Sequence, residues 1–191
     1  SFDAGIPNGV PTVSKDTLES LKNIEHVQGA TLYRSRQSYQ AIFRNNTSLD
    51  GGYIMGVNQD YFSIAGLTIK QGRGITEDDN KKYRQVAVLD ETSAKLLFGE
   101  ENPIGKTIEI SSTPFTIVGV CADKETFEPT MESIDDYHTY NQSTGSKVYV
   151  PSESWPIFYQ FDEPQNALLK VDATSNMTRV GKEAATILNT N

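Results

Sequence analysis

The stretch that decides the fold runs from Tyr53 to Val120. Residues 53–79 read YIMGVNQDYFSIAGLTIKQGRGITEDD, residues 86–110 read VAVLDETSAKLLFGEENPIGKTIEI, and residues 115–120 read FTIVGV. Short apolar runs alternate here with turn-forming residues such as Gly66 and the Asn102-Pro103 pair, and no catalytic motif lies among them. A segment with much turn chemistry and no visible reaction centre is more typical of a protein that binds or couples than of an enzyme.

The apolar runs of this stretch predict short strands with helical turns between them. The expected strands cover residues 53–57, 86–89, 106–110 and 115–121, the last two joined as a hairpin around residues 112–114. A short helical turn over residues 60–64 would end at Gly66. A helix over residues 91–98 would begin at Asp90 as its N-cap and end at Gly99.

The Gly72-Arg73-Gly74 triplet and the acidic run after it could each be a ligand site or a turn. The triplet lacks the length and the Lys-Ser/Thr pair of a phosphate loop, so its glycines are expected to permit a tight turn with positive φ. Arg73 could pin that turn by pairing with a carboxylate. Residues 77–79 (Glu-Asp-Asp) could hold calcium but lack the alternating oxygen ligands, and more simply follow Thr76 as cap and first helical turn.

Both ends of the chain combine helix and strand. A helix is expected over residues 14–24, followed by strands over 30–33 and 39–43 with a polar turn at 35–37. Near the other end, strands are expected over residues 147–150 and 167–171. The last helix would present a face made of Met177, Val180, Ala184, Ile187 and Leu188. We therefore predict an α+β fold of two lobes: one built from residues 1–57 and 152–191, and a strand-rich lobe of residues 58–151 inserted into it.

Composition excludes several classes of protein. The chain has 191 residues and a formal net charge of -8, with 25 acidic against 17 basic residues. Nucleic-acid partners are disfavoured because phosphate contacts need clustered Lys and Arg. No apolar run reaches the roughly 18 residues of a membrane helix. The single cysteine, Cys121, follows an apolar run and is expected to be a buried small hydrophobe.

The candidate chemistry is sparse. The chain has two histidines, His26 and His138, and neither has a second ligand at metal spacing, so no metal and no cofactor are expected. A nucleophile elbow is absent from the sequence, and Cys121 has no basic neighbour in sequence to activate it. A hydrolase that uses carboxylates of the loop 126–146, such as Glu132 and Asp135, stays open as an alternative.

Two aromatic segments are candidate partner surfaces. The first contains Trp155, Phe158, Tyr159 and Phe161, and the second is the long polar loop that carries Tyr137, His138 and Tyr140. Closely spaced aromatic side chains suit a protein interface, and long loops in compact domains are often functional. The alternative for the first segment is that its aromatic side chains fill the junction between the two lobes.

At this point the order and spacing of the motifs resemble a known family. Those motifs are Gly56-Val57-Asn58, Asp60-Tyr61-Phe62, Gly72-Arg73, Phe98-Gly99, Asn102-Pro103-Ile104-Gly105-Lys106, the run 115–120 and Tyr149-Val150-Pro151. The chain resembles the MacB-type periplasmic core domain, the large extracytoplasmic loop of ABC transporter permeases of the MacB/FtsX-like superfamily. The resemblance covers nearly the whole chain, with the loop 122–146 and the aromatic segment after Pro151 outside the shared pattern.

The resemblance implies a domain of two lobes, a porter-like lobe formed by the chain ends and a sabre-like lobe formed by the insertion. The domain would lie between two membrane helices of a permease, and the permease would be a homodimer. Such permeases are similar to type VII exporters, in which ATP and magnesium act in a cytoplasmic ATPase part. The extracytoplasmic domain relays the resulting motion, which is called mechanotransmission. The resemblance also implies a membrane-fusion-like partner protein and a cargo such as a macrolide or an antimicrobial peptide. This domain itself would hold no cofactor and would not be an enzyme.

The resemblance leaves a second function and the compartment open. An FtsX-like regulator would use the same kind of loop to activate a cell-wall hydrolase outside the membrane. The Lys-, Asn- and Asp-rich, Arg-poor composition suggests a low-GC Gram-positive source. The domain would then be extracellular, and export of or resistance to antimicrobial peptides would be favoured over macrolide efflux; in a Gram-negative source it would be periplasmic.

Overall fold

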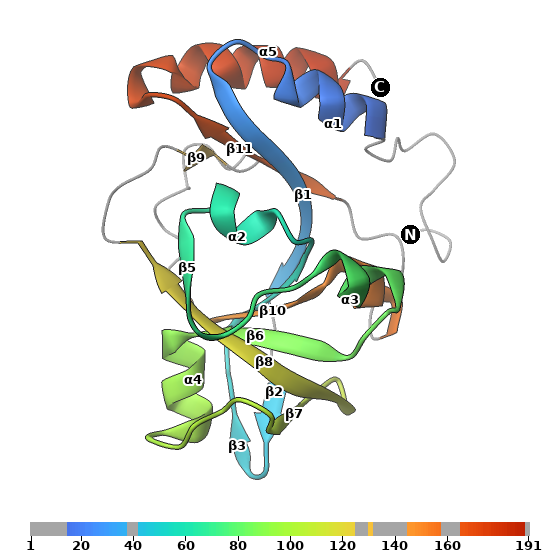
Figure 1. Ribbon diagram of the computed structural model, residues 1–191, viewed down its shortest axis with the longest axis vertical. Helices are drawn as coiled ribbons and strands as arrows, with labels where there is room; N and C mark the ends of the chain where they lie inside the picture. Colours follow the sequence, from blue (N-terminus) through green and yellow to red (C-terminus); the bar gives the residue numbers. More distant parts are fainter. Residues whose placement is uncertain (1–14, 38–41, 125–129, 132–144, 158–164, 190–191) are drawn as a thin grey trace.

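The computed structural model describes residues 15–37, 42–124, 130–131, 145–157 and 165–189 (Figure 1). The helices are α1 (Lys15–Lys22), α2 (Tyr61–Ile64), α3 (Glu77–Lys81), α4 (Glu91–Phe98) and α5 (Met177–Asn189), with 3-10 helices η2 (Ser152–Ile157) and η3 (Thr174–Asn176). The strands are β1 (Val27–Gln37), β2 (Ile42–Arg44), β3 (Thr47–Ser48), β4 (Tyr53–Val57), β5 (Leu67–Gly72), β6 (Val86–Asp90), β7 (Thr107–Ile110), β8 (Thr113–Asp123), β9 (Thr130–Met131), β10 (Lys147–Pro151) and β11 (Asn166–Val171). The expected α+β class is confirmed.

The strands form one mixed sheet in the order β3-β2-β7-β8-β6-β10-β4-β1-β11-β9, with β5 also paired to β8. The pairs β4–β10 and β6–β8 are parallel, and the other pairs are antiparallel. Strand β1 has two sets of partners, because residues from Val27 to Tyr33 pair with β11 and residues from Arg34 to Gln37 pair with β4. One unbroken strand therefore runs from the helix-covered end of the molecule into the strand-rich region.

The strand-rich region buries both faces of its sheet, because side chains alternate along each strand. On one face lies the α4 cluster: Ile42, Leu49, Ile54, Ala87, Leu89, Leu97, Phe98, Ile108, Ile110, Phe115, Ile117, Val148, Val150 and Trp155. On the other face lies the junction cluster: Tyr33, Met55, Val57, Tyr61, Phe62, Ile64, Ile75, Val88, Cys121, Tyr149 and Leu168. Helix α4 covers the first face and α2 the second, as neighbouring residues of β10 illustrate: Val148 and Val150 face α4, and Tyr149 faces α2.

The chain ends build a third core. The end cluster consists of Leu21, Ile24, Ala30, Ala167, Leu169, Val171, Met177, Val180 and Ala184. Helices α1 and α5 lie side by side over one face of β1 and β11 (Figure 1). The opposite face of the same two strands supplies Tyr33 and Leu168 to the junction cluster. The junction cluster therefore joins the chain-end strands to the inserted ones, with α2 between them.

The sequence predictions agree with the structure in most of the central stretch. Strand β4 covers the predicted residues, and α4 begins at Asp90, whose carboxylate accepts a hydrogen bond from the backbone N–H of Ser93. Gly99 ends α4 with φ 62°. The predicted hairpin forms, but its turn is Ser111-Ser112, both with positive φ, because Pro114 already pairs with Glu109 inside the strands.

One prediction near the start of the chain is wrong. The polar turn expected at residues 35–37 is strand, because the backbone there pairs with β4 although its side chains are polar. The two-lobe boundaries at residues 57/58 and 151/152 stay a prediction, and the α4 cluster extends across both of them. Ile42, Ile54 and Trp155, from segments assigned to the chain-end lobe, pack with the inserted strands in the α4 cluster. Within the described residues of the chain, none of the helices has the length and apolar character needed to cross a membrane.

Candidate functional site

Four aromatic rings at the centre of the junction cluster connect three elements that are far apart in sequence. Tyr33 of β1 and Tyr61 of α2 have ring centroids 5.5 Å apart, in an edge-to-face arrangement. Tyr149 of β10 lies 5.8 Å from Tyr61 and 5.2 Å from Phe62. Aromatic pairs at such separations add stabilisation to the area they bury. A displacement of β1 is therefore resisted by α2, and through α2 by β10.

Asn58 fixes α2 against β1 at this junction. Its side-chain oxygen accepts a hydrogen bond from the backbone N–H of Asp60 at 2.9 Å, which closes an Asx turn in front of α2. The same oxygen accepts a hydrogen bond from the hydroxyl of Thr31 on β1 at 2.8 Å. The position of the short helix is thus set by a polar contact as well as by its aromatic rings.

Two titratable groups of the junction cluster, Cys121 and Tyr149, are held in their neutral forms. Burial raises the pKa of the Cys121 thiol to about 12, with Asp90 and Asp123 adding to the effect. Burial also raises the pKa of Tyr149 well above its usual value. Neither group is a nucleophile at neutral pH, because the reactive form of each is the anion. Cys121 is fully buried, as the sequence predicted.

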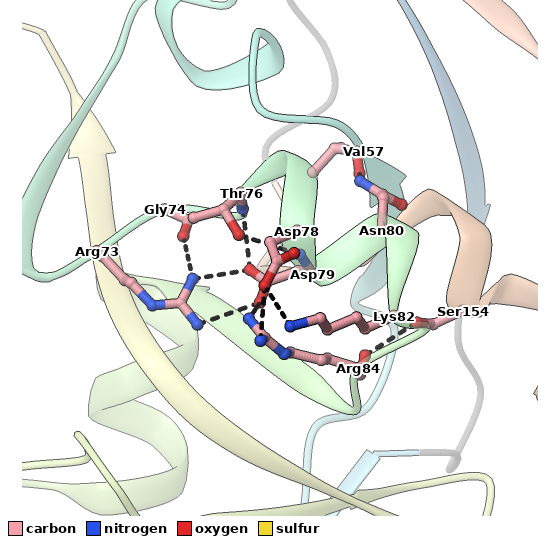
Figure 2. A network of polar contacts seen from close by, with 10 residues as sticks. All are labelled: Val57, Arg73, Gly74, Thr76, Asp78, Asp79, Asn80, Lys82, Arg84 and Ser154. Carbon is pink, nitrogen blue, oxygen red and sulfur yellow. Dashed lines mark hydrogen bonds and ion pairs between the residues drawn. The ribbon is translucent and has the colours of Figure 1, made fainter.

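Next to the junction cluster, Asp79 organises a network of polar contacts (Figure 2). Its side chain is 0% exposed, and Arg73 donates to both of its oxygens at 2.7 and 3.2 Å. Arg84 donates to Oδ1 at 3.1 Å, and the backbone N–H of Thr76 donates to Oδ2 at 2.9 Å. The Thr76 hydroxyl in turn accepts from the backbone N–H of Asp79 at 3.0 Å, so the two residues form a complete capping box for α3.

The charge of Asp79 is stabilised by these donors. Burial alone raises the pKa of its carboxyl, but the hydrogen bonds from Arg73, the Thr76 backbone and Arg84 outweigh burial and lower the pKa to about 2. Asp79 is thus the carboxylate partner that was predicted for Arg73. The acidic run after Thr76 forms the first turn of α3, as expected.

Gly72 has φ 67°, and a Cβ there would collide with the carbonyl oxygen of Val118. The positive φ expected for Gly74 is not found.

Helix α3 is also tied to the far side of the sheet. The side chain of Asn80 donates to the Val57 carbonyl at 3.2 Å and accepts from the Glu153 backbone N–H at 2.8 Å. The Ser154 hydroxyl donates to the Arg84 carbonyl at 2.9 Å. The network therefore joins the end of β4, the turn after β5, and η2.

A groove of about 390 Å³ opens between α2 and this network. Phe62, Leu67, Ile69 and Ile75 give it an apolar lining, and Arg73 and Lys124 are its charged residues. Phe62 belongs both to the groove and to the aromatic junction, and Arg73 belongs both to the groove and to the network. A molecule in the groove would contact the two elements, α2 and the turn after β5, that connect the regions of the domain.

Trp155 is not a surface residue. It is 0% exposed and packs in the α4 cluster, where a Cβ on Gly56 would lie 2.8 Å from its ring. Trp155 is thus covered by its own domain in this structure, and its predicted contact with a partner stays a prediction. Its large apolar ring fills the space that Gly56 leaves on β4. By the predicted boundaries, Trp155 belongs to the chain-end lobe and packs against strands of the inserted lobe, on the face of the sheet opposite the four rings described above.

The other predicted partner-binding residues, Phe158, Tyr159, Phe161, Tyr137 and Tyr140, lie outside the described residues, as do His138, Glu132 and Asp135. The roles predicted for these residues therefore stay predictions.

His26 lies within the described residues. Its Nδ1 lies 2.7 Å from Asp172 and its Nε2 lies 3.3 Å from Glu25. Over the described ranges, no three His, Cys, Asp or Glu side chains are grouped as metal ligands.

Sequence reasoning missed the aromatic junction and the groove. Tyr61, Phe62 and Tyr149 stand inside motifs that carried the family resemblance, but aromatic residues in a motif do not reveal which other rings they will meet. The groove left no signal, because its lining comes from α2, β5, the following turn and the end of β8.

The sequence profile described as the MacB-like periplasmic core domain matches residues 3–187 of the chain. The chain belongs to this family. The ABC transporter permease YvrN of Bacillus subtilis, described as uncharacterized, is 30% identical to this core domain over 179 residues, which are 94% of this chain and 41% of YvrN. The macrolide export ATP-binding/permease protein MacB of Aggregatibacter actinomycetemcomitans is 37% identical over 116 residues, covering 55% of this chain and 18% of that protein. The core domain thus spans less than half the length of either relative.

Solved structures agree with the fold. The periplasmic region of MacB from Actinobacillus actinomycetemcomitans has a TM-score of 0.64 to this core domain at 25% identity, covering 95% of this chain and 75% of that one. The extracellular domain of the ABC-type transporter YknZ from Gram-positive bacteria has a TM-score of 0.62 at 21% identity, covering 93% and 83%. Both are regions of transporters that lie outside the cytoplasm.

Proposed function

We propose that this core domain is the extracytoplasmic portion of an ABC transporter permease, and that it relays ATP-driven motion to a membrane-fusion-like partner or to cargo. ATP and magnesium would act in the ATPase portion of the transporter, and the permease would work as a homodimer. The cargo would be a peptide or a macrolide-like drug. The domain would be extracellular in a Gram-positive cell and periplasmic in a Gram-negative one.

The observation that carries the proposal is the division of β1 between two regions of the molecule. Its first residues pair with β11 beneath α1 and α5, and its last residues pair with β4 in the strand-rich region. A strand held by ladder hydrogen bonds along its length cannot be displaced at one end without moving the other. The aromatic junction braces the same strand through Tyr33. Stiff, packed elements of this kind are what a relay requires.

The positions of α1 and α5 support the same function. The start of α1 and the end of α5 lie at the same side of the molecule (Figure 1). Membrane helices attached at these two points would both act on the end cluster, and their displacement would enter the domain through β1. The hairpin of β2 and β3 lies at the opposite end, where a transmitted movement would be largest (Figure 1).

The test measures movement rather than transport, because the cargo is unidentified. In the permease that carries this domain, a spin label is attached at Asn46→Cys in the exposed turn between β2 and β3, while Cys121 is buried and stays unlabelled. The distance between the labels of two permease copies is then measured with and without ATP. We expect ATP to change this distance. Six-residue Gly-Ser linkers inserted before Lys15 and after Asn189 should abolish the change while ATP hydrolysis continues.

A matched control carries the same linker between Ser111 and Ser112, in the exposed turn of the β7–β8 hairpin. This insertion lies off the path through β1 and should leave the ATP-dependent change intact. A distance that responds to ATP equally with and without the flanking linkers would refute the relay. A distance that never responds to ATP would refute it as well.

A further inference from the structure

The groove beside Phe62 differs in charge from the rest of the molecule. Among the described residues that line it, Arg73 and Lys124 are cationic and none is acidic, although the chain as a whole has a net charge of -8. The remaining polar lining consists of Gln59, Ser63 and Thr76, which carry no charge. The groove therefore has two cationic side chains beside an apolar wall. Asp79, which pairs with Arg73, is not among the lining residues, so the groove suits an anionic ligand better than a cationic one.

Arg73 is held in place at the edge of this groove. Its Nη1 donates to the Gly74 carbonyl at 2.9 Å and to Asp79 at 2.7 Å, and its Nη2 donates once to Asp79 at 3.2 Å. A guanidinium group has five N–H donors. The donors that these three bonds leave over, at Nε and Nη2, have no partner among the described residues. The side chain is 42% exposed, so a ligand can reach the guanidinium.

This arrangement lowers the cost of binding an anion. The bidentate contact with the buried Asp79 fixes the guanidinium before any ligand arrives, so little side-chain freedom is lost on binding. The apolar lining by Phe62, Ile69 and Ile75 offers a hydrophobic surface next to that fixed charge. The volume of about 390 Å³ lies in the range of small-molecule sites, which combine apolar walls with a few fixed polar groups.

We propose that the groove binds an anionic amphiphile: an aliphatic chain that lies against Phe62, Ile69 and Ile75, with a carboxylate that accepts hydrogen bonds from the spare donors of Arg73. Lys124 adds positive charge near that carboxylate. Because the ligand would touch α2 on one side and the turn after β5 on the other, it would stiffen the connection between the aromatic junction and the Asp79 network. The proposal stands apart from the relay of ATP-driven motion, since it concerns only what the groove binds.

The test titrates the 191-residue chain with three molecules of equal chain length: octanoate, octan-1-ol and octylammonium. Backbone amide shifts are followed by NMR, and affinity is measured by calorimetry. We expect octanoate to shift the amides of Ser63, Gly74 and Thr76 first. We expect octylammonium to bind at least about tenfold more weakly than octanoate, because it meets two like charges. Octan-1-ol should fall between them.

Two variants identify the groove as the site. Ser63→Trp places a large ring at the exposed lining position on α2 and should abolish octanoate binding. Lys124→Gln should weaken it several-fold without changing the melting temperature. The matched control is Lys95→Gln, an exposed lysine on α4 outside the groove, which should bind octanoate like the wild type.

Equal affinity for octanoate and octylammonium would overturn the proposal, and so would shift changes spread over the surface or octanoate binding that survives Ser63→Trp. Absence of octanoate binding would overturn it too. Since this experiment uses the domain without ATP or membrane, its failure leaves the relay of motion untouched. Failure of the spin-label experiment likewise leaves the groove proposal standing.

Discussion

The two ends of β1 lie in cores of different character. Toward β4, the strand-rich region contains fully buried large side chains such as Trp155 and Phe115, and a carboxylate, Asp79, that is 0% exposed and has donors on both oxygens. Toward β11, the end cluster contains the small side chains of Ala30, Ala167 and Ala184 between the strands and two helices. Its polar link, His26 with Asp172, is 26% and 37% exposed.

This difference indicates where the domain yields first. Local opening is easiest where little apolar surface is buried and polar contacts are open to water. The strand-rich region should therefore behave as a stiff body, and the end region as a softer base that absorbs some of any movement at α1 and α5. The following experiments test that contrast, in order of decreasing expected effect.

Removing the ring of Trp155 should have the largest effect. Trp155→Ala is expected to lower the free energy of unfolding by about 3–5 kcal/mol, since it empties a large site in a packed core. The measurement is urea denaturation. Ile157→Ala, an exposed position on the same 3-10 helix, is the control and should cost less than about 1 kcal/mol. If the two variants cost the same, the α4 cluster is not the stiff core described above.

Removing the carboxylate of Asp79 should cause the next largest loss of stability after Trp155→Ala. Asp79→Ala leaves Arg73 and Arg84 without their shared partner and opens the capping box of α3, with an expected cost of about 2–3 kcal/mol from the lost charge interactions and the lost cap. Asp78→Ala removes a neighbouring carboxylate that is 49% exposed, and should barely change the melting temperature because solvent screens its ion pairs. Thermal melting of the two variants decides whether burial, rather than charge alone, makes this network structural.

The same carboxylate predicts a dependence of stability on pH. Its pKa is lowered from 3.8 to about 2 on folding, so its contribution is fully present above pH 3.8 and is lost as the pH falls through about 2. The contribution is about 2 kcal/mol by that linkage. We therefore expect the difference in unfolding free energy between the wild type and Asp79→Asn to shrink from pH 5 to pH 2. A difference that stays constant over this range would show that the charge of Asp79 is not stabilised by its donors.

The smallest effect is expected in the end region. His26→Asn keeps a residue type that tolerates the positive φ of 78° at this turn, while it removes the imidazole from Asp172. The loss in global stability should lie within the error of a denaturation curve, because the pair is exposed to solvent. The local loss of stability should be visible by hydrogen exchange as faster exchange of the Asp172 amide. In the wild type this amide donates a hydrogen bond to the His26 carbonyl at 2.9 Å. Unchanged exchange at that amide would show that the His26–Asp172 pair does not differ in this way from the Asp79 network.

Sequence reasoning succeeded where the information is local. The cap at Asp90, the helical turn that ends at Gly66 and the cap at Thr76 depend on residues within a few positions of each other, and all three are found. It failed where partners come from elsewhere: residues 35–37 look like a turn until β4 pairs with them. For Trp155 the sequence left a partner surface and a buried position open, and the space that Gly56 leaves for its ring could not be read from the sequence. The groove and the aromatic junction belong to this second class.

The division of β1 also has a consequence for how the chain is made. Its last residues pair with β4, which follows soon after in the sequence, but Val27 and its neighbours pair with β11, the last strand among the described residues. During synthesis, Ala30 and the other residues of β1 that face the end cluster have only α1 to pack against until β11 and α5 emerge. Pairings between distant segments of a chain also slow folding. The newly made domain therefore passes through a stage in which its first strand is half paired, with an apolar face and a free strand edge that a chaperone could hold.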